Sequence, residues 1–185
     1  MDTLAHGLWG GAAFGQRARS QWKWAFILGM CPDLFSFAPF ILTHLGDIGE
    51  RWAHHRFGPP DHRLIPAYVY HAYNVTHSLL VWAAFFALAY AVAAYRHTGV
   101  SASTTPSRPY ADSPIRTIWP FGAWGLHILC DIPTHSTRFF PTPYLWPFHT
   151  PFVNGFRWAR PSFMLANYAL IGLTYLVLRF QKSRS

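Results

Sequence analysis

Charged residues are scarce in this sequence. Asp, Glu, Lys and Arg make up 12% of its 185 residues, whereas soluble domains carry about 25%, so the chain has too little charge for an ordinary water-facing surface. Hydrophobic residues reach 51% and aromatic residues 18%, and nine residues are Trp. Trp and Tyr favour the interface between membrane and water, where a ring can be half buried. The composition predicts an integral membrane protein with a single domain, 1–185. The alternative is a soluble protein with a large aromatic core.

Cysteines are few, and neither a dense basic run nor a signal-peptide pattern is evident. Two cysteines, Cys31 and Cys130, are too few for a disulfide framework. Both lie in apolar stretches close to an aspartate, so we expect buried thiols and leave open a role as metal ligands. The net charge of +8 is scattered over short connections; anionic lipid headgroups explain it, and no run predicts a nucleic-acid groove. No basic region precedes an apolar core at the N-terminus, so we expect targeting through the membrane helices themselves.

Two uncharged apolar stretches are long enough to cross a bilayer, since a spanning helix needs roughly 18 residues: 78–95 and 161–178. Three more are interrupted: 4–14, 22–45 and 118–132. The stretch 4–14 is rich in Gly and Ala, so a neighbouring helix can approach it closely. We expect 22–45 to form two short helices joined at 31–33, because Pro32 ends or kinks the first of them. The pattern predicts an all-α membrane bundle of about four to six helices, some short or broken.

The connections between these stretches are polar but give no clear orientation. Three Lys or Arg residues fall in each of five places: 16–23, 46–63, 96–116, 134–160 and 179–185. The positive-inside rule needs an asymmetry, so only the basic C-terminal tail leans toward the cytoplasm. We expect a mobile loop over 96–116, because it contains a Ser/Thr/Pro run. The Pro- and aromatic-rich segment 134–160 is expected to lie at the membrane interface.

Five ionisable residues stand out within the apolar stretches: His6, Asp33, His77, His127 and Asp131. Such groups are costly at membrane depth and usually face the bundle interior or a wet cavity. His127 and Asp131 are four residues apart, which places both side chains on one face of a helix. If consecutive helices run antiparallel, all five residues lie at the same end of the bundle. The alternative is that they cap helices or hydrogen-bond to one another.

Imidazole and carboxylate together favour Zn²⁺, with Mn²⁺ or Fe²⁺ as alternatives. A catalytic zinc usually takes about three protein ligands, so five candidates predict roughly one to three ions. Such a centre activates water and binds the oxygens of a phosphoryl or acyl group. We assign catalytic roles to Asp33 and Asp131, and we expect Thr76 and Ser78 to orient His77 or to bind substrate. Weaker candidates are Asp2, His135 and His71, and the histidines expected to be solvated in a connection, His54, His55 and His62.

Several short segments, in order along the chain, carry a likeness to a known family: MDTLAHGLWG (1–10), PD (32–33), THSLL (76–80), HILCDIPTH (127–135) and WPF (146–148). They resemble the YdjM-like metal-dependent hydrolases of the bacterial inner membrane. The resemblance implies a multi-pass helical protein with a hydrolase site, distantly related to zinc-dependent phospholipases C and single-strand nucleases. The resemblance implies that five residues are metal ligands: His6, Asp33, His77, His127 and Asp131. Family members often have His-Arg shortly before THS, where this chain has Ala72-Tyr73.

The sequence thus predicts a membrane-bound hydrolase with a metal site at one membrane face. A substrate arriving from the bilayer suits that place, so we expect cleavage of a phosphoester or other ester in a lipid or lipid-linked substrate. Membrane lipids are the expected partners and nucleic acid is not, and 141–151 is expected to line the entry. One alternative is a metal carrier or sensor, which needs polar residues at both ends of the spans. The other is a structural protein whose polar residues pair within the bundle.

Overall fold

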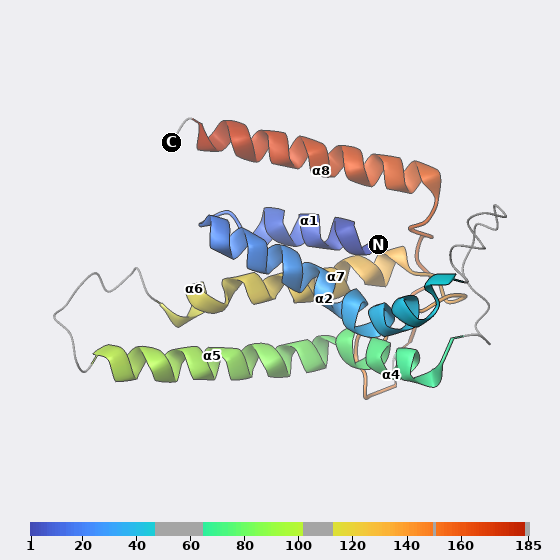
Figure 1. Ribbon diagram of the computed structural model, residues 1–185, viewed down its shortest axis with the longest axis horizontal. Helices are drawn as coiled ribbons and strands as arrows, with labels where there is room; N and C mark the ends of the chain where they lie inside the picture. Colours follow the sequence, from blue (N-terminus) through green and yellow to red (C-terminus); the bar gives the residue numbers. More distant parts are fainter. Residues whose placement is uncertain (47–64, 102–112, 150, 184–185) are drawn as a thin grey trace.

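The computed structural model describes residues 1–46, 65–101, 113–149 and 151–183. Over these ranges the chain is all-helical, without a strand. The helices in chain order are α1 (Thr3–Phe14), α2 (Arg19–Thr43), α4 (Ala67–Thr76), α5 (Leu79–Ser101), α6 (Pro114–Ile118), the 3-10 helix η2 (Trp119–Phe121), α7 (Gly122–Thr134) and α8 (Pro161–Lys182). The predicted all-α helical bundle is confirmed (Figure 1).

Three of these helices are long and apolar enough to cross a membrane: α2, α5 over Leu79–His97, and α8. None of the residues in the most apolar window of α5 is buried, and only 6% of those in α8 are. Their apolar side chains therefore face outward, which suits a helix that lies against lipid rather than water. Pro161 occupies the first turn of α8, where the missing N–H would have no partner within the helix in any case.

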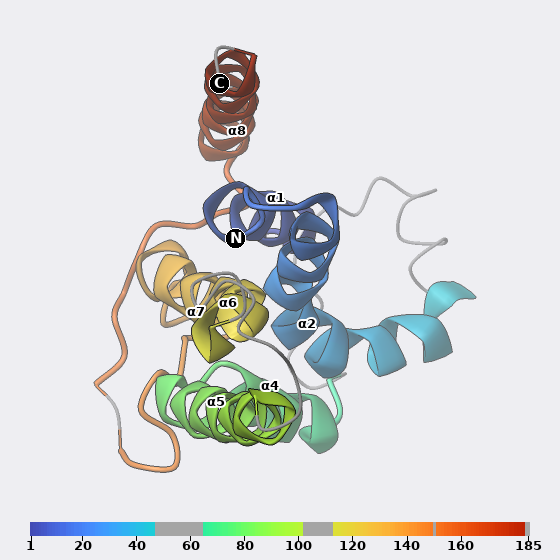
Figure 2. The same cartoon turned by 90° about the vertical axis from the view of Figure 1, so that its left-hand side faces the viewer.

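The helices run alternately in opposite directions along the long axis of the molecule (Figure 1). α1, α5 and α8 run one way, and α2 and the α6–η2–α7 segment run the other. α1, α2 and α7 pack together, α5 lies against α6 and α7, and α8 stands on the outer side of α1 (Figure 2). We call the end where α1, α5 and α8 begin, and where α2 and α7 finish, the site end. The other we call the opposite end.

Glycines let the central helices approach closely. A Cβ atom on Gly29 of α2 would lie 2.7 Å from the carbonyl oxygen of His6 in α1. A Cβ atom on Gly10 of α1 would lie 2.7 Å from the carbonyl oxygen of Ala25 in α2. Small residues at helix contacts are the usual means of close packing in membranes. The prediction that a neighbouring helix approaches 4–14 closely is confirmed.

The prediction of two short helices joined at 31–33 is wrong. α2 continues without a break through Pro32 and Pro39, and Figure 2 shows it changing direction along its length. Proline removes one backbone N–H and can kink a helix instead of ending it. The carbonyl of Gly29 accepts a hydrogen bond from His127 Nδ1 at 2.7 Å, so α7 supplies a partner to the backbone near the kink.

Two other expectations differ from the structure. α4 was not predicted, because its ten residues mix apolar and polar side chains and do not stand out as an apolar stretch. The expected loop over 96–116 is helical at both ends, since α5 continues to Ser101 and α6 begins at Pro114. The rest of the expected mobile loop, 102–112, lies outside the described residues. The connection histidines also lie outside them: His54, His55 and His62.

The segment between α7 and α8 is tied back onto the site end. The backbone N–H of Gly155 donates to the carbonyl of His135 at 2.8 Å. The Ser78 hydroxyl, between α4 and α5, donates to the carbonyl of Trp146 at 2.6 Å. Phe148 in the same segment is 70% exposed. Exposed aromatic surface therefore lies at the site end, and its contact with the membrane interface stays a prediction.

Candidate metal centre

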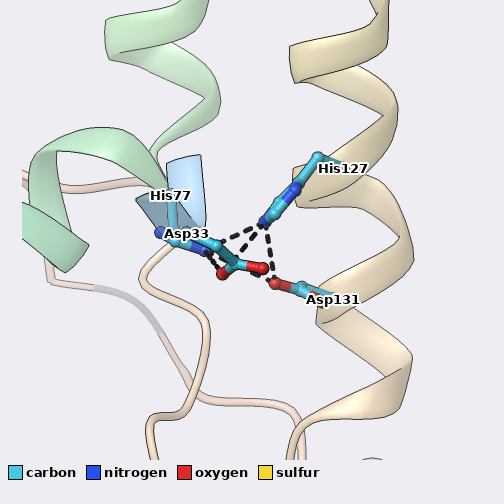
Figure 3. A group of neighbouring side chains, drawn as sticks. All are labelled: Asp33, His77, His127 and Asp131. Atoms are coloured by element: carbon cyan, nitrogen blue, oxygen red, sulfur yellow. Dashed lines mark hydrogen bonds and ion pairs between the residues drawn. The ribbon is translucent and has the colours of Figure 1, made fainter. Parts of the chain in front are cut away.

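Four of the five predicted ligands converge on one point. Asp33 comes from the middle of α2, His77 from the residue that caps α4, and His127 and Asp131 from α7. One ligand atom from each residue lies within 4.8 Å of the others, and all four residues are buried. Figure 3 shows the side chains pointing toward one another from three separate segments. This buried group can hold a divalent metal ion, and we call it the four-residue group.

The two histidines of the four-residue group are held with Nε2 toward the carboxylates. His127 Nδ1 lies 2.7 Å from the carbonyl oxygen of Gly29, and His77 Nδ1 lies 3.2 Å from that of Tyr73. A carbonyl oxygen can only accept, so each Nδ1 carries a proton and donates it to the hydrogen bond. Each Nε2 then keeps a lone pair. Proteins commonly orient a metal-binding histidine in this way, with its other ring N–H bonded to a carbonyl.

Five of the six distances between the four ligand atoms are close to those around a tetrahedral ion. His77 Nε2 and His127 Nε2 are 3.1 Å apart. They lie 3.5 and 3.7 Å from Asp33 Oδ1, and 3.5 and 3.3 Å from Asp131 Oδ2. Ligands at about 2.0–2.1 Å from a tetrahedral zinc ion stand roughly 3.4 Å from one another. Two lone pairs and two carboxylates in one buried space also repel one another unless a cation or proton lies between them.

Asp131 has further partners on its other oxygen. His6 Nε2 lies 2.9 Å from Asp131 Oδ1, His135 Nε2 lies 3.4 Å from it, and the amine of Met1 also contacts it. His135 Nδ1 lies 2.7 Å from the carbonyl oxygen of Phe140, so it donates and leaves a lone pair on Nε2. That Nε2 is buried without a hydrogen-bond partner among the described residues. The fifth predicted ligand, His6, and the weaker candidate His135 therefore both reach Asp131.

Burial and neighbouring charges set the protonation of these side chains. Burial, with a smaller effect of the neighbouring His127, lowers the pKa of His6 to about 4. His6 is therefore neutral near pH 7. Burial alone would raise the pKa of Asp131, but the adjacent imidazole of His6 and then the terminal amine hold that pKa well below its ordinary value. A neutral imidazole and an ionised carboxylate are the forms that bind metal.

Thr76 and Ser78 use their hydroxyls differently. Thr76 Oγ1 lies 3.0 Å from His77 Nδ1, so it can help to orient this ring, which is one of the roles predicted for it. Ser78 Oγ donates to the carbonyl of Trp146 and accepts from the N–H of Val81 at 3.3 Å. The Ser78 hydroxyl is thus engaged with the backbone of other segments rather than with the ligand atoms.

The other candidates lie outside the four-residue group. His71 is exposed on α4. Asp2 caps α1, because its carboxylate accepts the N–H of Ala5 at 3.0 Å. Cys31 and Cys130 are free, half-buried thiols, and neither belongs to the convergent set of ligand atoms.

Two further residues lie beside the centre. His135 follows Asp131 by four residues, the spacing that also relates His127 to Asp131, so the sequence does carry a signal for it. Thr3 was not singled out, yet its hydroxyl donates to Asp33 Oδ2 at 2.8 Å. The only sequence signal for Thr3 is its position three residues before His6, which places both on one face of α1.

Comparisons of the chain with protein-family models, curated proteins and solved structures found no match. The resemblance to YdjM-like hydrolases therefore stays a prediction from short motifs. We infer function from the geometry of the four-residue group and of its surroundings.

Proposed function

We propose that this protein is a membrane-bound, metal-dependent hydrolase that holds Zn²⁺ in the four-residue group. The observation that carries the proposal is the convergence of two imidazole nitrogens and two carboxylate oxygens, 3.1–3.7 Å apart in the measured pairs. Nitrogen and oxygen ligands together suit Zn²⁺, Mn²⁺ or Fe²⁺, and tetrahedral spacing favours zinc among them. The likeness to YdjM-like proteins supports a multi-pass place in the inner membrane.

The chain's own residues leave one side of the centre for substrate. A bound zinc ion supplies a Lewis acid and lowers the pKa of a water molecule. The side chain of Asp33 is 10% exposed, whereas those of His77, His127 and Asp131 are 0% exposed, so water and substrate reach the centre past Asp33. The Thr3 hydroxyl holds Asp33 Oδ2 in place. A catalytic zinc keeps one position open for water. If His77, His127 and Asp131 held the ion, Asp33 would stand beside that position and be the carboxylate best placed to accept a proton from the attacking water.

The other oxygen of Asp131 would offer a place for a second ion if that ion displaced the amine of Met1, which contacts this oxygen. A carboxylate can give one oxygen to each of two ions, and here Oδ2 faces the four-residue group while Oδ1 faces His6 and His135. The lone pair on His135 Nε2 has no other partner among the described side chains. Paired ions bind the attacking and the leaving oxygen of a phosphoryl group together, so a second ion would favour phosphoester cleavage.

Exposed apolar side chains on the helices that carry the centre favour a lipid substrate. Leu34 and Phe35 directly follow Asp33 in α2 and are 43% and 63% exposed, and Leu4, next to Thr3, is 48% exposed. Acyl chains can pack against such side chains while the ester of the headgroup reaches the centre. The substrate in this proposal is a lipid or lipid-linked molecule with a phosphoester or other ester in its headgroup.

The distribution of polar side chains disfavours a metal carrier. A carrier needs a polar path across the membrane. The buried polar side chains of the described residues come from the first half of α1, the second half of α2, the junction of α4 and α5, the middle and end of α7 and the segment after it: His6, Asp33, Ser36, Thr76, His77, Ser78, His127, Asp131, Thr134, His135 and Thr142. No buried polar side chain in the described ranges continues the path to the opposite end.

Asp33→Asn is expected to lower hydrolysis of a lipid phosphoester by about 10²–10⁴-fold, because an amide cannot accept the proton of the attacking water. The measurement is headgroup release from a panel of phospholipids, lipid diphosphates and acyl esters in mixed micelles, with zinc-loaded protein. His71→Ala is the matched control, since His71 is exposed and outside the centre, and it should keep the wild-type rate. The hydrolase proposal is overturned if the wild type cleaves no ester in the panel faster than micelles without protein.

A further inference from the structure

The two ends of the bundle differ in basic charge. The described residues include ten Lys and Arg, and seven of them lie at the opposite end: Arg17, Arg19, Lys23, Arg96, Arg116, Arg179 and Lys182. The other three, Arg138, Arg157 and Arg160, lie in the segment between α7 and α8 at the site end. The fold therefore gathers basic side chains from four separate parts of the chain at one end.

This asymmetry is invisible in the sequence, where five stretches carry three basic residues each. The described basic residues of three of these stretches, 16–23, 96–116 and 179–185, meet at the opposite end, because α1, α5 and α8 all finish there. Those of 134–160 lie at the site end.

The acidic residues are distributed differently from the basic residues. The Asp and Glu residues in the described ranges are Asp2, Asp33 and Asp131, and all three belong to the site end. Asp33 and Asp131 are buried there in the four-residue group. The described Asp and Glu residues and most of the described Lys and Arg residues therefore lie at different ends of the bundle.

We propose that the opposite end faces the cytoplasm and that the metal centre lies at the non-cytoplasmic face of the membrane. Connections rich in Lys and Arg remain on the cytoplasmic side when a membrane protein inserts. The anionic lipids of the cytoplasmic leaflet also attract basic side chains near the membrane surface. The partner that fits the opposite end is thus the anionic cytoplasmic leaflet, and the C-terminal end of α8 is cytoplasmic.

The orientation also restricts the class of lipid that can be the substrate. This inference about the substrate rests on the proposed function. The centre opens past Asp33 and its exposed apolar neighbours at the non-cytoplasmic face. The substrate is therefore a lipid or lipid-linked ester whose headgroup lies in the outer leaflet. A reaction that delivers the lipid to that leaflet must come first, because a charged headgroup does not cross the apolar core unaided.

Cysteine labelling tests the orientation without using metal or activity. In a background with Cys31→Ala and Cys130→Ala, single cysteines replace three exposed residues, Ser20 and Ser183 at the opposite end and His149 at the site end. A membrane-impermeant maleimide is added to bacterial spheroplasts that express the full chain. We expect labelling of the His149→Cys protein alone, and labelling of all three proteins after the membrane is permeabilised.

Labelling of Ser20→Cys and Ser183→Cys in intact spheroplasts, with His149→Cys protected, would overturn the orientation. Labelling of all three before permeabilisation would overturn it too, since it would mean that the chain inserts both ways. A second variant tests the cause: replacing Arg17, Arg19 and Lys23 together by Gln should increase the fraction of inverted chains. Because the readout is independent of hydrolysis, a failure here leaves the proposed metal centre standing, and an inactive protein leaves the orientation standing.

Discussion

Replacing His127 and Asp131 together by alanine is expected to remove the bound metal and to abolish hydrolysis, while the protein still inserts into the membrane. These side chains supply two of the four convergent atoms, which lie 3.3 Å apart. Asp33 and His77 alone would leave two ligands, fewer than the roughly three protein ligands that a catalytic zinc usually has. Elemental analysis of detergent-purified protein, prepared without chelator, measures the result. We expect about one ion per chain or more in the wild type, and a small fraction of that in the variant.

Two single variants separate this effect from general damage. His71→Ala changes an exposed histidine outside the centre and should leave the metal content unchanged. His135→Gln should keep the ion of the four-residue group and lose only a second ion beside Asp131 Oδ1. Equal metal content in the wild type and in the double variant would contradict the centre. A wild type without metal, beside a double variant that is merely less stable, would favour the structural alternative.

Gly29→Ala is expected to destabilise the protein by about 1–3 kcal/mol, the usual cost of overpacking a close contact. The added Cβ would lie 2.7 Å from the carbonyl oxygen and 3.2 Å from the carbonyl carbon of His6, so α1 must move away from α2. The same glycine presents the carbonyl that fixes the His127 ring. Metal binding should therefore weaken together with stability. Thermal unfolding in detergent, with and without added zinc, measures both effects.

Gly172→Ala in α8 is the matched control, because a Cβ there would meet nothing within 4 Å. Alanine is favoured over glycine inside a helix by up to about 1 kcal/mol, so this variant should be as stable as the wild type or slightly more so. If Gly29→Ala were as stable as Gly172→Ala and bound zinc normally, the close packing of α1 on α2 would not be needed to hold the centre.

Apolar length and polar interruptions were enough to predict much of the fold and of the site. The spans over 78–95 and 161–178 match α5 and α8, since a long uncharged stretch has few folds open to it. His127 and Asp131 were predicted to share a face because helical spacing alone decides this. The convergence of these two with Asp33 and His77 followed from alternating helix directions, and the structure brings all four together.

The remaining features depend on contacts that spacing does not reveal. Whether Pro32 ends or kinks α2 depends on how the surrounding helices pack against it, and α7 packs there from a distant part of the chain, with His127 bonded to the Gly29 carbonyl. His6 lies beside Asp131 and not within the four-residue group. Its place depends on the position of α1 along α7, which residue spacing does not reveal. Predicting the membrane orientation requires knowledge of which connections lie at the same end of the bundle. The sequence does not give this, because each of its five polar stretches carries the same number of Lys and Arg residues.

X-ray absorption at the zinc edge of the purified, zinc-loaded wild type tests the central claim most directly. We predict a nearest shell of nitrogen and oxygen at about 2.0–2.1 Å, with outer scattering from imidazole rings and with no sulfur. A sulfur shell at about 2.3 Å would move the metal to Cys31 or Cys130 and contradict the centre. A shell of oxygen alone, without imidazole scattering, would show zinc that is not held by His77 and His127, and would contradict it equally.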